Sequence, residues 1–176
     1  MTPDVQTTPN GHIWVSYFDE GVFGDGLGRH GVVCFDSEGV PIFKYSEFAE
    51  RNQLPFVADC YAMNVVNEQE VWLSYYTDFP LVSMKKFQLR QIWKDFGCMD
   101  RAFALLGGSV VFPKCYTRRE GKSQLLRRAF SDSPQAEPLD AVDEAGVPID
   151  GLFTAVARGP HFYLLTESAL YELMTT

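Results

Sequence analysis

The sequence predicts an all-β protein built from about four propeller-like blades, each a meander of short antiparallel strands. Two observations support this fold class: one sequence pattern recurs along the chain, and helical periodicity is scarce. The strongest copies are HIWVSYFDE at 12–20 and EVWLSYYTDF at 70–79, which share the order apolar, Trp, apolar, Ser, aromatic, aromatic before an Asp. Four short strands recurring every 40 to 55 residues or so are typical of propeller blades.

Each copy of the pattern forms the second half of a predicted hairpin whose first half begins at an aspartate. The four starts lie 55, 41 and 50 residues apart, at Asp4, Asp59, Asp100 and Asp150. Turn signals separate the two halves of each hairpin: PNG, NEQ, GG and RGP in chain order. A third strand follows every hairpin, and a fourth strand follows in the first three units.

The strands are grouped into blades near 4–47, 59–92, 100–142 and 150–176 of a single domain spanning 1–176. Runs such as IWVSYF are apolar on both faces, as expected for a blade packed between two neighbours. A two-sheet β-sandwich with the same strands is the alternative fold. YSEFAERNQ (45–53) and QLRQIWKDF (88–96) each fit a turn or two of helix, although LRQIW also fits a fourth strand.

Composition and charge favour a soluble, cytoplasmic protein. The 176 residues are 46% hydrophobic and 14% aromatic, too apolar for a disordered chain. No apolar run approaches the roughly 20 residues of a membrane span, and the N-terminal segment lacks signal-peptide features. The cysteines, Cys34, Cys60, Cys98 and Cys115, form no closely spaced pair of the kind that binds zinc. We therefore expect reduced thiols packed as small apolar side chains.

The segments GHIWVSYFDEGVFG, CFDSEG and DCYAMNV followed by VWLSYYTDFPLV resemble a group of uncharacterised bacterial β-propeller-like proteins. The resemblance is specific over residues 4–83 and generic beyond them. It implies a fold, and no activity, cofactor or catalytic residue is carried over with it. Propellers host enzymes, receptors and scaffolds alike, so the fold alone does not decide the function.

The fourth unit has only three predicted strands, so the last blade is expected to keep an unpaired edge. An unpaired edge invites pairing with another chain. Self-association through this edge is the favoured interpretation, and closure into a small four-bladed ring is the alternative.

Residues 26–31, GLGRHG, match the dinucleotide-binding pattern G-x-G-x-x-G, but their surroundings do not fit it. That motif needs a strand that runs directly into the turn and a helix that begins at its end. Here IWVSYF ends at Phe18, and VVCFD after Gly31 is strand-like. We predict a long loop between two blade strands.

Carboxylates supply the candidate ligand-binding residues. Asp19 and Glu20 belong to the same glycine-rich loop, where clustered acids suit a hard cation such as calcium. If each repeat-leading aspartate opens the innermost strand of its blade, Asp4, Asp59, Asp100 and Asp150 would ring one end of a central channel. They would then bind a ligand, or a divalent metal that activates water for hydrolysis. Capping of local backbone N–H groups is the structural alternative.

A basic tract supplies the candidate partner-binding residues. Residues 85–128 contain eleven Lys and Arg against three acids, although the whole chain carries a net charge of −8. Arg118, Arg119, Arg127 and Arg128 lie within it. The stretch TRREGKSQLLRR has no aromatic residue on which bases could stack, so nucleic acid is an unfavoured partner. A solvated blade edge or a surface for an acidic partner fits better.

Taken together, these patterns favour a non-catalytic module that binds a ligand or a protein. A divalent-metal-dependent hydrolase that uses the aspartate ring is the alternative, and binding of an anionic partner through the basic tract is a weaker one. No nucleophile elbow or triad pattern is present in the sequence.

Overall fold

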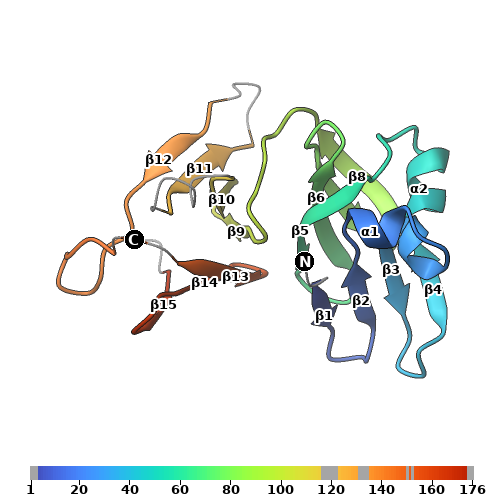
Figure 1. Ribbon diagram of the computed structural model, residues 1–176, viewed down its shortest axis with the longest axis horizontal. Coiled ribbons are helices and arrows are strands. Elements are labelled where there is room, and N and C mark those ends of the chain that lie inside the picture. The colour runs from blue at the N-terminus through green and yellow to red at the C-terminus, as the bar shows by residue number, and fades with distance from the viewer. Residues whose placement is uncertain (1–3, 116–122, 131–134, 150, 152, 174–176) are drawn as a thin grey trace. The chain divides into compact units, whose positions relative to one another are not determined.

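The computed structural model describes residues 4–115, 123–130, 135–149, 151 and 153–173. Its strands form four antiparallel sheets, and in each sheet the strands follow one another in chain order (Figure 1). This meander organisation confirms the predicted all-β, propeller-like fold class. No helix in the described ranges is long and apolar enough to cross a membrane.

The chain divides into two compact units, Met1–Cys98 and Met99–Thr176. The first sheet of the N-terminal unit contains β1 (Val5–Thr7), β2 (Ile13–Ser16), β3 (Val32–Phe35) and β4 (Pro41–Lys44). The second sheet contains β5 (Asp59–Val65), β6 (Glu70–Tyr76), β7 (Leu81–Lys85) and β8 (Gln88–Trp93). Residues 88–93 are therefore a strand, which decides between the two interpretations of QLRQIWKDF.

The C-terminal unit also holds two sheets. One contains β9 (Ala104–Leu106), β10 (Ser109–Pro113), β11 (Leu125–Ala129) and β12 (Glu137–Leu139). The other contains the three strands β13 (Thr154–Arg158), β14 (His161–Leu165) and β15 (Leu170–Glu172). The single-domain organisation stays a prediction.

Each unit has its own apolar core. In the N-terminal unit, one face of each sheet contributes alternate residues to a cluster that includes Trp14, Cys34, Phe43, Met63, Leu73, Tyr75 and Val82. In the C-terminal unit, the cluster includes Ala104, Leu125, Ala155, Phe162 and Leu164. The period-two spacing of these residues within each strand explains why the sequence pattern located the strands correctly.

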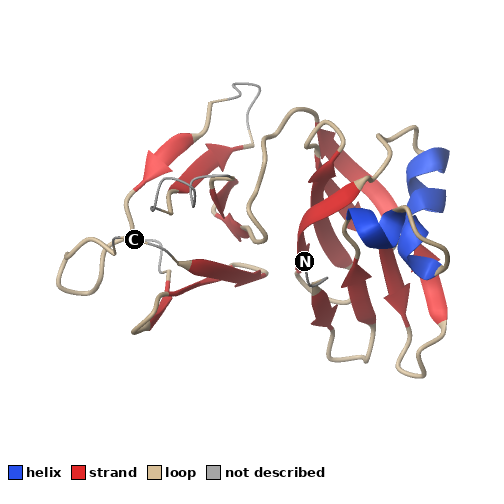
Figure 2. Ribbon diagram, viewed as in Figure 1, coloured by secondary structure: helices blue, strands red, loops and turns tan. Residues whose placement is uncertain are grey.

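The described helices all lie in the N-terminal unit, as the blue segments of Figure 2 show. The connection between β2 and β3 holds the short helix α1 (Asp19–Val22) and the 3₁₀ helix η1 (Leu27–His30), and α2 (Tyr45–Arg51) follows β4 directly. The glycine motif thus leads from a 3₁₀ turn into a strand, as predicted, and not into an α-helix. Gly31 has φ of +71°, and an added Cβ would lie 2.7 Å from Val57 Cγ1, so glycine is required there.

A buried glutamine joins the two sheets of the N-terminal unit. The side-chain amide of Gln6, in β1, donates a hydrogen bond to the carbonyl of Met63 in β5 (2.9 Å). The Gln6 Oε1 atom accepts a hydrogen bond from the backbone N–H of Val65 (2.9 Å). The same Nε2 atom also donates to Asp4 Oδ2 (2.8 Å), so both hydrogens and the oxygen of the amide have partners. Gln6 thereby provides hydrogen-bond partners for two backbone groups of β5, in the neighbouring sheet.

We predict that Gln6→Ala lowers the free energy of unfolding of the N-terminal unit by about 2 to 4 kcal/mol, because the substitution leaves a buried N–H and a buried carbonyl without partners. Urea titration followed by tryptophan fluorescence measures this unit selectively, since Trp14, Trp72 and Trp93 all lie within it. Gln69→Ala is the matched control, because Gln69 is exposed and its substitution should cost less than about 0.5 kcal/mol. Equal effects of the two substitutions would contradict the structural role of Gln6.

Candidate functional site

The starts of β1 and β5 form a polar cluster at one end of the N-terminal unit. Asp4 directly precedes β1, and its backbone N–H donates to Ser16 Oγ (3.2 Å) while its carbonyl accepts from the Ser16 N–H (2.9 Å). Asp59 is the first residue of β5, and the next backbone N–H, that of Cys60, donates to the carbonyl of Tyr17 (3.1 Å). The end of β2 therefore holds both aspartate-led strand starts.

The loop acid Asp19 belongs to this cluster. It is the first residue of α1, two residues after Tyr17, and its Oδ1 atom accepts a hydrogen bond from the Glu20 N–H (2.8 Å). The pKa of the Asp59 carboxyl is raised, first by burial and then by the negative charge of Asp19. Asp59, a repeat-leading aspartate, and Asp19, a loop acid, therefore lie close together, although they are far apart in the sequence.

The other two repeat-leading aspartates belong to the C-terminal unit. Asp100 lies four residues before β9, its backbone N–H donates to the carbonyl of Pro113 (3.0 Å), and its carboxylate lies 3.9 Å from Arg101 Nε. Asp150 lies outside the described residues. Within the part of the chain that the structure describes, no three His, Cys, Asp or Glu side chains are grouped so that they could hold a metal ion.

The thiols near the cluster are not activated for nucleophilic chemistry. The pKa of the Cys60 thiol is strongly raised by burial, by Asp4 and by Asp59. Burial and the charge of Asp36 raise the pKa of Cys34 to about 12. A thiol with a raised pKa stays protonated at neutral pH and is a poor nucleophile. The chemistry that this cluster can perform is electrostatic.

The expectation that all cysteines are reduced is wrong for two of them. Cys34 and Cys60 are free, but Cys98 and Cys115 are disulfide-bonded. The sequence separation of these cysteines could not show this, because the approach of two thiols is decided by how the strands fold back and not by their spacing along the chain.

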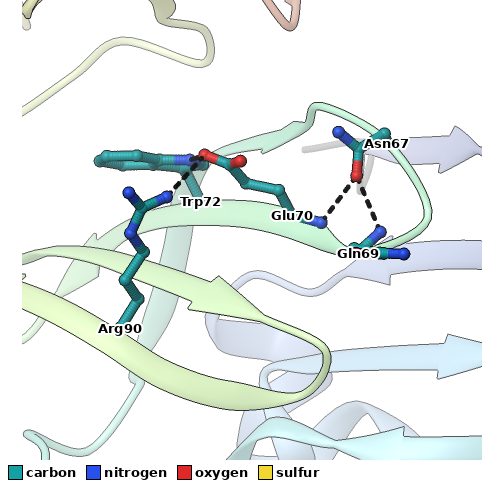
Figure 3. A network of polar contacts seen from close by, with 5 residues as sticks. All are labelled: Asn67, Gln69, Glu70, Trp72 and Arg90. Atoms are coloured by element: carbon teal, nitrogen blue, oxygen red, sulfur yellow. Dashed lines mark hydrogen bonds and ion pairs between the residues drawn. The ribbon is translucent and has the colours of Figure 1, made fainter.

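At the opposite end of β5 from the cluster, the turn between β5 and β6 leads into a polar network (Figure 3). Asn67 Oδ1 accepts hydrogen bonds from the N–H groups of Gln69 (2.8 Å) and Glu70 (3.0 Å), which closes the turn. The Glu70 carboxylate then accepts from Trp72 Nε1 (2.8 Å) and lies 3.8 Å from Arg90 Nη1. Because Glu70 and Asn67 are engaged locally, we assign them structural roles.

Most basic residues of the tract that the structure describes are exposed, and Arg128 is the exception. Arg127 and Arg128 lie on β11. The Arg127 Nε atom donates a hydrogen bond to Ser109 Oγ (3.0 Å), and Arg127 as a whole residue is exposed. Arg128 is only 7% exposed. Arg118 and Arg119 lie outside the described residues. Of the four candidate arginines, the structure describes two, and Arg127 is the exposed one of these. The surface for an anionic partner stays a prediction.

The sequence comparisons show a family that spans most of the chain. The model of the YxzG family matches residues 32–173. The chain belongs to the YxzG family. No curated protein matches the chain. The YxzG match includes the C-terminal unit and thus extends well beyond residues 4–83, over which the sequence resemblance was specific.

We predict that Asp59→Asn raises the free energy of unfolding of this YxzG-family protein at pH 7 by less than about 1 kcal/mol. The effect is small because the carboxyl is only partly buried and solvent screens its charge. The pKa of Asp59 is higher in the folded protein than in the unfolded chain, so the ionised carboxylate destabilises the fold at pH values above the folded-state pKa. This cost disappears as the pH falls from the folded-state pKa to the unfolded-state pKa, which is near about 4. Thermal melts between pH 3 and pH 8 should show the gain at neutral pH and none at the acidic end. Glu38→Gln, which removes an exposed acid from a turn of the same unit, is the control.

Proposed function

We propose that this protein is a non-catalytic binding module, and that one of its partners is a second copy of the same chain. The observation that supports this proposal is the outward face of the sheet β13–β15. This sheet has three strands in the described part of the chain, whereas each of the other sheets has four. Val156, Leu165 and Leu170 are 58%, 51% and 65% exposed on that sheet.

The two faces of this sheet differ sharply in their surroundings. Ala155, Phe162 and Leu164 point into the core of the C-terminal unit. Leu165 pairs with Leu170 across β14 and β15, on the opposite face from these core residues. The same outward face also carries the exposed Arg158 and the ion pair between His161 and Glu172, so its apolar part is a patch and not the whole face. An apolar patch beside an open strand edge loses solvent-exposed apolar area when another chain adds to it.

A second copy of the chain can cover these apolar residues with the same surface of its own. When β15 of one copy pairs antiparallel with β15 of the other, the two sheets become one, and the exposed leucines of both copies meet on the same face. Such an interface is two-fold symmetric and closes on itself. Backbone hydrogen bonds hold the added strand, and the leucines provide the apolar burial.

We predict that the protein sediments as a concentration-dependent dimer, and that Leu170→Lys weakens dimerisation at least about tenfold, because two charged side chains replace two buried leucines. Analytical ultracentrifugation of both proteins measures the change. Val40→Lys, at an apolar side chain of similar exposure in the N-terminal unit, is the control and should leave the dimer intact. A monomer at all concentrations, or an equal effect of both variants, would contradict the proposal.

The metal-dependent hydrolase remains a separate candidate that a direct experiment tests. The charge of Asp19 acts on Asp59, and the charges of Asp4 and Asp59 act on Cys60. A bound cation would offset this accumulation of negative charge, although the described His, Cys, Asp and Glu side chains form no group of three that could hold a metal ion. For the non-catalytic module we expect no saturable rise in melting temperature with Mg²⁺, Mn²⁺, Ca²⁺ or Zn²⁺. A rise that one of these metals produces and that Asp59→Asn abolishes would favour the hydrolase instead.

A further inference from the structure

Two phenylalanines at the end of the N-terminal unit are exposed and touch each other. Phe23 ends α1 and is 71% exposed, and Phe56 lies between α2 and β5 and is 55% exposed. Their ring centroids are 6.2 Å apart. They are more exposed than any other phenylalanine that the structure describes. Because phenylalanine is usually buried, such a pair marks a surface that a partner covers.

A second aromatic group lies on the adjoining loop. Tyr76, at the end of β6, is 48% exposed, and its ring centroid is 5.5 Å from that of Phe79. Backbone hydrogen bonds hold this loop against the Phe56 segment: Ala58 N–H donates to the Tyr76 carbonyl (2.7 Å), and Thr77 N–H donates to the Phe56 carbonyl (3.3 Å). The two aromatic groups therefore belong to neighbouring segments that are fixed to each other.

The same segments are strongly acidic. The carboxylates that these segments bring to this end of the unit belong to Asp19, Glu20, Asp59 and Asp78, and Arg29 is the basic residue of the loop between β2 and β3. Asp19, Glu20 and Asp78 are exposed. Asp59 lies directly opposite Tyr76 in the register of β5 and β6, and the charge of Asp19 acts on it. Exposed aromatic rings thus share one end of the unit with a local excess of negative charge.

We propose that this aromatic–acidic surface, formed by Phe23, Phe56, Tyr76 and Phe79 with Asp19, Glu20, Asp59 and Asp78, binds an arginine-rich segment of a protein partner. The carboxylates attract and pair with the guanidinium groups, and the ring faces stack on them. Electrostatic attraction from the acidic segments speeds the encounter and makes the binding sensitive to salt. This surface lies in the N-terminal unit and is independent of the proposed dimerisation through β15.

The ring and charge contributions can be separated with substitutions at exposed positions. Phe23→Ser removes a ring that is mostly in solvent, so the fold should be retained. Phe23→Tyr keeps the ring and serves as the conservative variant. The double variant Asp19→Asn and Glu20→Gln removes two charges and keeps similar side-chain volumes. Val147→Ser, at an exposed apolar residue in the other unit, is the matched control.

The test is fluorescence anisotropy of a labelled peptide of alternating arginine and glycine, titrated with the full chain. We expect saturable binding that weakens as salt is added, and no binding of the matched glutamate–glycine peptide. Phe23→Ser and the double acid variant should each weaken binding about fivefold, and Phe23→Tyr and Val147→Ser should leave it unchanged. The proposal is overturned if the arginine peptide does not bind, if the glutamate peptide binds equally well, or if neither variant class weakens binding.

Discussion

A buried amide fixes how the two sheets of the N-terminal unit are aligned across their apolar core. The Gln6 side chain bonds simultaneously to the Met63 carbonyl and the Val65 N–H, and so holds β1 in one alignment against β5. Its remaining hydrogen bond, to Asp4, ties the start of β1 to the same alignment. The hydrogen bond from the Cys60 N–H to the Tyr17 carbonyl supports the same alignment from the end of β2. The alignment that Gln6 fixes also determines how the starts of β1 and β5 lie in the polar cluster.

Burial decides which kind of chemistry that cluster supports. The carboxyl of Asp59 and the thiol of Cys60 both have raised pKa values, chiefly because burial disfavours their charged forms. A protonated thiol among acids is a poor nucleophile. The exposed carboxyl groups of Asp19, Glu20 and Asp78 are accessible to a partner. The same arrangement therefore disfavours covalent catalysis and favours recognition of positively charged groups.

Much of the fold follows from sequence periodicity, and the site follows from it only in part. The recurring apolar runs located strands such as β6 and β14, because these strands bury their apolar side chains, β6 on both of its faces. Asp59 was placed correctly at the start of β5. Asp100 was not at the start of β9, because an isolated bridge between Met99 and Lys114 and a residue at positive φ, Arg101 at +69°, come before the strand begins at Ala104. The meeting of Asp19 with Asp59, and the disulfide-bonded state of Cys98 and Cys115, depend on contacts between distant segments, which periodicity does not encode.

The meander order of the sheets bears on how the chain is made. Every strand pairs with a neighbour in sequence, so each sheet has mainly local contacts, which favours rapid formation. On the ribosome, the strands of the first sheet are complete once residue 44 has emerged, long before the second unit is synthesised. The Gln6 amide must wait until Val65 follows it. Until then, the Gln6 side chain lacks the partners in β5 that it has in the folded unit, and β1 has an edge at which another strand can pair.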